Sequence, residues 1–388
     1  MTILFAFAHL VHHLVTALPV PLLPFIRSDF GLNYTQSAWA ISAFSISYGM
    51  SMLPAGWLAD RVSRSILLLI GVAGVGVAGV LAGVSTQYTT LLLFLAIMGF
   101  LGGAYHPSSL PIITSFVNKK KKGQAVGIHM VGGASSYFLA PLIAAPIAGI
   151  WGWRSPYIIF SLPTIIFGIL LYAIVNTRKN RQTISAKTTE PVSADFSSEI
   201  FRRRRLVIYI ILCAFTHAVT ISVIAFIPLF IFDHFNVSKE ISGTMVAFYY
   251  SSGVWASFVG GLISDRFGKL PVTIAVCLLG GLCVLLLRVV SIIWVIGIIL
   301  IFIGIANYIR SVTSEVYILE QTFEKNRSTV LGIFYLGSTE GGGLLTPVVG
   351  LLIDKYGFNV SYVVAGFSIL AATIVCTFFL MSERQVKL

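Results

Sequence analysis

Charged side chains are scarce in this chain of 388 residues. Only 10% of the residues are Asp, Glu, Lys or Arg, and just 14 are acidic, whereas 57% are hydrophobic. A typical soluble domain carries charge on about a quarter of its residues. This composition excludes an ordinary soluble protein and indicates an integral membrane protein.

Cysteine is also rare, and the four cysteines all lie inside apolar stretches: Cys213, Cys277, Cys283 and Cys376. No pair lies in a loop, which argues against a disulfide framework, so we interpret them as packing residues. The first apolar stretch lacks the basic start of a signal peptide, runs past 20 residues and has Pro19, Pro21 and Pro24 where cleavage would occur. We interpret this stretch as a spanning helix.

Long apolar runs fill the rest of the chain. Because about 20 apolar residues cross the roughly 30 Å of hydrocarbon as a helix, the sequence predicts an all-α integral membrane protein with twelve transmembrane helices. The predicted spans are 3–26, 37–59, 65–85, 89–116, 123–150, 155–175, 206–232, 241–263, 270–288, 291–318, 328–353 and 358–381.

The chain also repeats itself at an offset of 205 residues. Gly56 to Arg64 and Gly261 to Lys269 are two copies of one polar turn, and the same offset relates Phe30 to Phe235, Gly127 to Gly332, Gly152 to Gly357, and Tyr157 to Tyr362. We therefore predict two pseudo-symmetric six-helix bundles, 1–175 and 206–388, joined by a cytoplasmic linker, 176–205. Repeats of this kind build many secondary transporters, which bind substrate near the midplane between the halves.

Basic residues account for the formal charge of +12, and their positions indicate topology. Of the 26, 20 lie in the linker, the C-terminal tail and the turns on one side of the membrane, 5 lie in the opposite turns, and Arg310 lies inside a helix. By the positive-inside rule both termini are cytoplasmic in the cell membrane. Nucleic acid is therefore not an expected partner. The Arg202 to Arg205 run is a topological anchor or a site for anionic lipid.

Ionisable residues inside spanning helices are costly and mark functional positions. His9, His12, His13 and Thr16 are spaced to share one helix face, which we expect to line a cavity. Histidine titrates near neutral pH and could carry a proton, or each ring could hydrogen-bond a neighbouring helix. The predicted substrate-binding residues are His9, His12, His13, Tyr105, His106, His129, His217, Asn307 and Arg310.

Arg310 is the most informative of these residues, because a guanidinium stays charged and offers five donors to a planar anion. It needs a fixed carboxylate or an anionic substrate. Glu340 lies at a similar predicted depth and could pair with Arg310, or take a proton when a substrate anion replaces it. We predict proton coupling through His13 and Glu340, with Glu315 as a further candidate.

The doubled polar turn resembles the signature of the major facilitator superfamily, and the twelve spans and central linker extend this resemblance over the whole chain. The resemblance implies two six-helix bundles and alternating access. Carboxylates at the ends of helices can cap or pair with basic residues. We predict that the turn residues form a conformational latch: Asp60, Arg61, Arg64, Asp265 and Arg266.

The stretches from Gly102 to Ser109 and from Gly123 to Gly133 resemble the fosmidomycin-resistance exporter group, which has His-Pro followed by a Gln and a Gly-Gly pair. That group also carries His-Leu-x-Asn-Asp near its start. Here His12 and His13 replace the Asn-Asp pair, so the carboxylate is missing.

These patterns predict a proton-coupled secondary transporter, more an exporter than an importer, for a small organic anion or a polar drug-like molecule. We expect a monomer in the inner membrane, powered by the proton gradient and without a cofactor or resident metal. The zinc-protease motif is absent, so we do not expect an enzyme. A transition-metal transporter using His9 and His13 stays open as an alternative.

Overall fold

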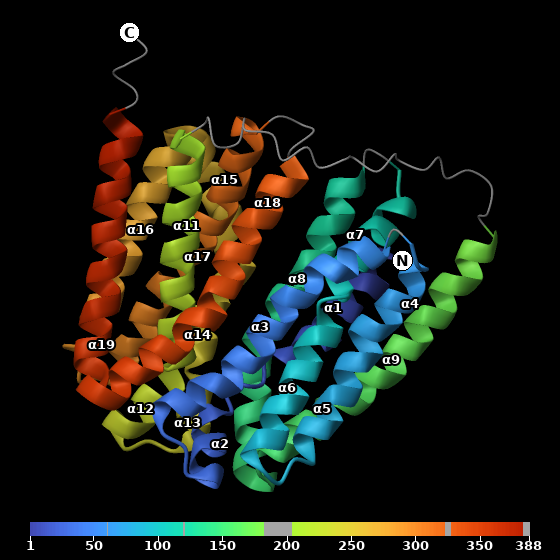
Figure 1. The fold of residues 1–388 in the computed structure, drawn as a ribbon, viewed down its shortest axis with the longest axis horizontal. Coiled ribbons are helices and arrows are strands. Elements are labelled where there is room, and N and C mark those ends of the chain that lie inside the picture. The colour runs from blue at the N-terminus through green and yellow to red at the C-terminus, as the bar shows by residue number, and fades with distance from the viewer. Residues whose placement is uncertain (60, 119–120, 182–203, 323–326, 383–388) are drawn as a thin grey trace. The chain divides into compact units, whose positions relative to one another are not determined.

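The described chain is helical throughout. The computed structural model describes residues 1–59, 61–118, 121–181, 204–322 and 327–382, and within these ranges every regular element is a helix (Figure 1). Helices lie over all twelve predicted spans. The prediction of an all-α membrane fold is confirmed.

The number of unbroken spanning helices is lower than twelve. Among the described residues, eight helices are long and apolar enough to cross a membrane, or nine if the bent pair Lys239–Val254 and Ala256–Phe267 forms one span. Three features lower the count from twelve to nine. The run Val330–Met381 covers two predicted spans, and the predicted span 3–26 is divided by turns at residues 17–22. Two prolines lie in those turns, where each removes a backbone donor and clashes with the preceding helical turn. The helix Tyr34–Ala59, over the predicted span 37–59, is not among the helices that are apolar enough.

One compact unit contains the described residues of 1–188 together with 227–247. Within it α1 packs on α8, α3 on α6, and α5 on α9. Its elements are α1 (Thr2–Thr16), α2 (Leu23–Phe30), α3 (Tyr34–Ala59), α4 (Arg64–Leu69), η1 (Ile70–Gly74), α5 (Val75–Gly83), α6 (Tyr88–Gly102), α7 (Tyr105–Ser115), α8 (Lys122–Trp151), α9 (Arg154–Arg181), α12 (Ile227–Phe235) and α13 (Lys239–Thr244).

The second unit contains the described residues of 189–226 and 248–388. In it α11 packs along α19, and α16 packs on α17 and α19. The elements of this part of the chain are α11 (Arg204–Ala225), α14 (Val246–Ser251), η3 (Ser252–Val254), α15 (Ala256–Phe267), α16 (Lys269–Leu286), α17 (Ile293–Gln321), α18 (Arg327–Tyr335), η5 (Leu336–Glu340) and α19 (Gly341–Ser382).

The compact units differ from the sequence repeats in one segment. Residues 227–247 belong to the second repeat, yet α12 and α13 pack against α2, and α13 also packs on α8, in the first unit. Of the predicted linker, α9 covers the first residues up to Arg181 and α11 starts at Arg204, while residues 182–203 lie outside the described part of the chain.

The repeat is visible in the backbone. Gly152 has φ of 81° and its counterpart Gly357 has φ of 75°, and an added Cβ at either position would meet no atom within 4 Å. These left-handed conformations, which favour glycine, mark where one helix gives way to the next.

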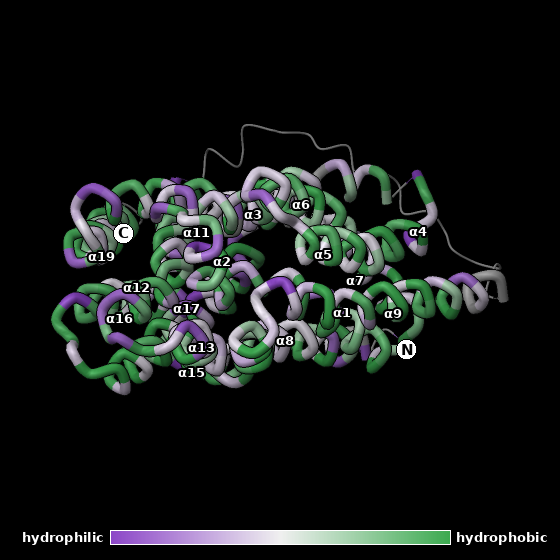
Figure 2. The backbone as a smooth tube through the Cα atoms, turned by 90° about the horizontal axis from the view of Figure 1, so that it is seen from below, coloured by the Kyte–Doolittle hydropathy of each residue, from purple (hydrophilic) through white to green (hydrophobic). Residues whose placement is uncertain are grey.

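The distribution of hydropathy agrees with a bilayer environment. In Figure 2 the tube is mainly hydrophobic green at α5 and carries hydrophilic purple at α13. Two π-helical turns, η1 and η5, interrupt the spans in which they lie. Such turns occur frequently at functional sites, and both lie beside residues of the candidate site.

Candidate functional site

Three histidines from three helices meet inside the first unit. His9 lies on α1, His106 on α7 and His129 on α8. The His9 and His129 rings stack with their centroids 4.2 Å apart, and the His106 ring lies edge-on to His9 at 5.2 Å. One ring nitrogen from each residue lies within 4.8 Å of the others. We call these three residues the histidine triad.

Backbone carbonyls fix the orientation of several of these rings. His9 Nδ1 lies 2.9 Å from the carbonyl oxygen of His129, and His129 Nδ1 lies 3.1 Å from that of Phe5. His12 Nδ1 lies 2.8 Å from the carbonyl oxygen of Gly71 in the π turn η1. Because a carbonyl oxygen only accepts, each Nδ1 is the donor. The alternative that the ring hydrogen-bonds a neighbouring helix therefore holds for His9 and His12, whereas His13 contacts Thr16 of its own helix.

Glycines allow the helices to approach closely enough for these contacts. A Cβ at Gly132 would meet the carbonyl oxygen of Ala6 on α1, and one at Gly133 would meet the His9 ring. A Cβ at Gly71 would lie 2.8 Å from the backbone nitrogen of Tyr105. Small residues at helix contacts are typical of membrane bundles, and here they bring α1 against α8.

The remaining predicted residues of the first unit surround the triad. His13 Nδ1 lies 2.9 Å from Thr16 Oγ1, and its ring lies 5.0 Å from that of Tyr137. Tyr105 is fully buried and stacks on His12 with the ring centroids 4.6 Å apart. The structure therefore brings His9, His12, His13, Tyr105, His106 and His129 into one cluster.

Arg310 forms the centre of a second polar cluster, in the second unit. Its guanidinium donates to the carbonyl oxygen of Cys213 at 2.8 Å and to Asn307 Oδ1 at 2.8 Å, and lies 2.7 Å from His217 Nδ1. The same His217 Nδ1 lies 2.9 Å from Asn307 Oδ1, so it either accepts a hydrogen bond from Arg310 or donates one to Asn307, depending on its tautomer. Arg310 is 4% exposed. Together with Asn307, Thr216 and Thr220 it borders a small pocket.

The two clusters occupy matching positions in the repeat, which the sequence analysis did not notice. Adding the offset of 205 to His12 gives His217, and adding it to Tyr105 gives Arg310. In the first unit these positions hold a stacked pair, His12 and Tyr105, and in the second a hydrogen-bonded pair, His217 and Arg310. The duplicated architecture thus places Arg310, in the interior of α17, where the first repeat has a tyrosine.

The acidic candidates lie close to the second cluster. Glu315 Oε1 accepts a hydrogen bond from the Ser311 hydroxyl at 3.2 Å, and Tyr335 is also hydrogen-bonded to this carboxylate. Glu340 is 8% exposed at the end of the π turn η5, which packs on α11. The pair of Arg310 with Glu340 stays a prediction. The described hydrogen-bond contacts of Arg310 are to the Cys213 carbonyl oxygen, Asn307 Oδ1 and His217 Nδ1.

The predicted latch residues lie at the ends of helices. Asp60 lies outside the described residues. Arg61 stacks on the Trp57 ring at 3.9 Å and donates to the Trp57 carbonyl oxygen. Asp265 lies 3.2 Å from Lys269 Nζ, which also contacts Glu320. Arg64 begins α4, and Arg266 lies over the ring of Phe267. A latch role for these residues stays a prediction.

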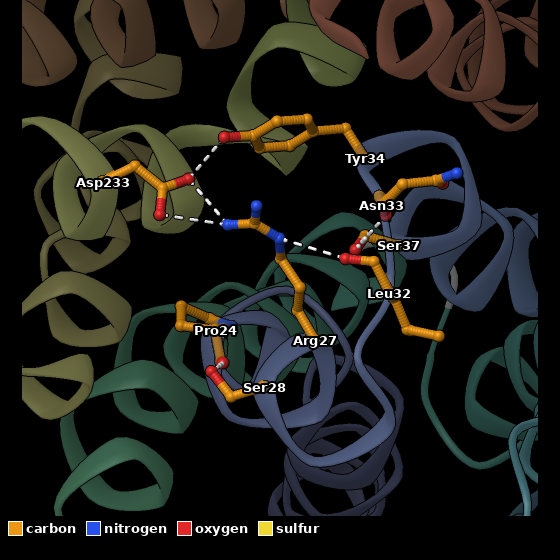
Figure 3. Close-up of polar contacts among 8 residues, drawn as sticks. All are labelled: Pro24, Arg27, Ser28, Leu32, Asn33, Tyr34, Ser37 and Asp233. Atoms are coloured by element: carbon orange, nitrogen blue, oxygen red, sulfur yellow. Dashed lines mark hydrogen bonds and ion pairs between the residues drawn. The ribbon is translucent and has the colours of Figure 1, made fainter.

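A polar cluster around Asp233 was missed by the sequence analysis. One guanidinium nitrogen of Arg27, on α2, lies 2.7 and 3.0 Å from the two carboxylate oxygens of Asp233, on α12 (Figure 3). The Tyr34 hydroxyl donates to the same carboxylate at 2.6 Å, and the Arg27 guanidinium lies over the Tyr34 ring. Arg27 and Asp233 are 206 residues apart in the chain, and no spacing pattern in the sequence pointed to their contact.

Tyr34 holds its proton in this cluster. It is the first residue of α3, before the predicted span begins at residue 37. Burial, together with the hydrogen bond to Asp233, raises the pKa of Tyr34 to about 12. Its hydroxyl is therefore a donor to Asp233 throughout the physiological pH range.

Comparison with known proteins identifies the family. The family model described as Major Facilitator Superfamily matches residues 5–314 and 226–387, which together cover nearly the whole chain. The chain belongs to the Major Facilitator Superfamily. It is therefore a multi-pass membrane transporter of small molecules and not an enzyme.

Relatives of this chain include multidrug resistance proteins. The chain is 30% identical over 263 residues to multidrug resistance protein MdtG of Proteus mirabilis, a match covering 66% of this chain and 62% of that protein. MdtG of Enterobacter lignolyticus is 23% identical over 91% of this chain and 86% of its own length. A probable L-galactonate transporter of Escherichia coli is 23% identical over 66% of this chain and 60% of that protein.

Solved structures share the fold at low sequence identity. A bacterial homologue of the human lysosomal transporter Spinster, in an inward-facing and occupied conformation, matches with a TM-score of 0.78 and 16% identity, covering 99% of this chain and 96% of that one. A POT family transporter in complex with 5-aminolevulinic acid matches with a TM-score of 0.81 and 13% identity, covering 98% and 96%. These likenesses confirm the major facilitator fold.

Proposed function

We propose that this chain is a proton-coupled secondary transporter that works by alternating access and exports a small organic anion or a polar drug-like molecule across the inner membrane. The proposal includes the finer resemblance to the fosmidomycin-resistance exporter group, both termini in the cytoplasm, a monomeric state and no cofactor beyond the proton gradient. The latch residues of the polar turns would control the rate of the conformational change.

The environment of Arg310 is the observation that carries this proposal. The side chain is buried in a membrane unit, and its described hydrogen-bond contacts are to a carbonyl oxygen, an amide oxygen and an imidazole nitrogen. Burying a cation without a carboxylate in direct hydrogen-bond contact is costly. An anionic group on the substrate would supply that contact.

Proton coupling would use ionisable groups near the two clusters. Glu315 lies five residues after Arg310 on the same helix, so a proton on its carboxyl group would change the local charge when the substrate anion leaves. Glu340 and His13 are the further candidates. The other histidines and Tyr105 would contact the substrate from the first unit.

The names of the relatives bear on the direction of transport and point both ways. The name multidrug resistance protein, carried by several relatives, favours an exporter of drug-like molecules. The probable L-galactonate transporter favours an organic anion and keeps import as the alternative.

The test is uptake into proteoliposomes under an imposed pH gradient. A thermal-shift panel of organic anions, phosphonates and polar drugs, starting with L-galactonate, selects the probe that raises the melting temperature most. We expect the gradient to drive accumulation of that probe by the unmodified protein and Arg310→Gln to abolish it, because the variant loses the charge that recognises the anion.

Arg288→Gln is the matched control, since Arg288 is an exposed arginine of the same unit. It should transport normally. Gradient-independent uptake that is the same in the Arg310→Gln variant and the unmodified protein would contradict both the coupling and the role of Arg310.

A further inference from the structure

The histidine triad brings together ring nitrogens that could act as metal ligands. His9, His106 and His129 come from three different helices, and their ring nitrogens converge within 4.8 Å. We propose that this triad binds a divalent first-row transition metal ion, such as Zn²⁺ or Co²⁺. The proposal replaces the expectation that the chain has no resident metal, and it does not depend on the transport function proposed above.

The tautomers of the rings support metal binding. The Nδ1–H groups of His9 and His129 donate to the carbonyl oxygens of His129 and Phe5, at 2.9 and 3.1 Å. The proton of each neutral ring is thereby placed on Nδ1, and the lone pair is left on Nε2. Metal-ligating histidines show this arrangement, in which the second nitrogen donates to a carbonyl or carboxylate and fixes the ring.

The Nε2 lone pair of His129 also supports metal binding. His129 is fully buried, and its Nε2 has no hydrogen-bond partner. A buried polar atom without a partner costs free energy. A metal ion bound by Nε2 would remove this cost, which hydrogen bonds to the described side chains do not.

The donor set selects the class of ion. Three neutral imidazoles suit zinc, copper, iron and nickel rather than magnesium or calcium, which prefer oxygen ligands. Zinc binds nitrogen at about 2.0 to 2.1 Å, which places tetrahedral ligands roughly 3.3 Å apart. The triad nitrogens lie within 4.8 Å of one another. Because the His9 and His129 rings stack at an interplanar angle of 13°, one of them must tilt out of the stack before both lone pairs can reach one ion.

Three protein ligands leave a fourth position open, as in zinc sites that bind an exogenous ligand. The triad itself contains no carboxylate. A hydroxide or another anion in the fourth position would therefore offset part of the charge of the ion.

The glycines of α8 allow α1 to approach closely enough for the triad rings to meet. Gly132 and Gly133 follow His129 by three and four residues and lie against Ala6 and His9. Helical residues at these separations share a face. The close approach of α1 and α8 thus stacks the two triad rings.

Optical titration with Co²⁺ alone tests the proposal on the full-length protein in detergent, after chelator treatment and removal of the chelator. We expect one Co²⁺ per chain, with visible d–d absorption bands that Zn²⁺ displaces. His106→Ala and His129→Ala should each weaken binding by more than the roughly 10- to 100-fold that is typical of changes to outer-shell partners. Binding should also weaken as the pH falls, because the metal binds neutral imidazole.

His234→Ala serves as the control, because it removes an exposed histidine that is not in the triad. It should bind Co²⁺ with unchanged affinity. The absence of bound Co²⁺ in the unmodified protein, or equal losses in the triad and control variants, would overturn the proposal.

X-ray absorption spectroscopy of the Zn²⁺-loaded unmodified protein decides the matter if the triad variants do not fold. The proposal requires three imidazole ligands at about 2.0 to 2.1 Å. Fewer than three would refute it. Failure of this metal site would leave the Arg310 uptake test unaffected, so the two proposals are separable.

Discussion

At the scale of single residues, Arg310 and Arg27 show two ways of holding a cation in this chain. Arg310 is buried and is held by a carbonyl, an amide and an imidazole. Arg27 is about a quarter exposed and contacts the Asp233 carboxylate directly. The first arrangement leaves a charge that a ligand could match, whereas the second satisfies its charge within the protein.

The Arg27 and Asp233 pair can be weighed with a double-mutant cycle. Arg27→Gln and Asp233→Asn should each destabilise the protein, because each leaves the other charge without its partner. The double variant should lose less than the sum of the two, with a coupling free energy of roughly 0.5 to 3 kcal/mol. Unfolding in detergent measures it.

The control for this cycle is Asn236→Ala combined with Arg27→Gln, since Asn236 follows α12 without contacting Arg27 among the described hydrogen bonds. That pair should be additive. A coupling near zero for Arg27 and Asp233 would show that the contact contributes no stability.

At the scale of helices, the sequence predicted the spans well because the lengths of the apolar runs and the 205-residue repeat can be read directly from it. The repeated left-handed glycines, Gly152 and Gly357, agree with that prediction. The turns at residues 17–22 and the π turns η1 and η5 were not predicted, because tertiary packing determines how a broken helix continues.

The sequence predicted part of the candidate site, because helix spacing shows which residues share a face. Spacing put His9, His12 and His13 on one helix face, and the structure brings all three into one cluster with His106 and His129. Which neighbours these rings contact could not be predicted, since His9 faces α8 whereas His12 contacts η1. The contact of Arg27 with Asp233 also depends on long-range packing.

Helix packing around the cluster predicts a specific effect of one glycine. Gly132→Ala should strongly lower the melting temperature, because its Cβ would meet the backbone carbonyl of Ala6, and overpacking costs about 1 to 3 kcal/mol. Gly127→Ala, on the same helix, is the matched control: no atom lies within 4 Å of its added Cβ. Equal melting temperatures for the two variants would contradict the close packing of α1 on α8.

At the scale of the whole molecule, gene duplication explains how two different polar clusters arose at equivalent positions. His12 and Tyr105 in the first repeat correspond to His217 and Arg310 in the second. The first unit gathers neutral histidines and tyrosines, and the second holds the cation with acidic residues nearby. The two units therefore differ in the charge of their polar clusters.

Proton movement driven by the substrate alone tests the account's central claim most directly. Proteoliposomes containing a trapped pH dye, with no imposed pH gradient, receive the probe selected by thermal shift on one side. If the protein is a proton-coupled exporter, the probe should flow down its gradient while protons move in the opposite direction, and Glu315→Gln should weaken this proton movement. Probe entry with an unchanged internal pH would contradict the claim that this transporter couples its substrate to protons.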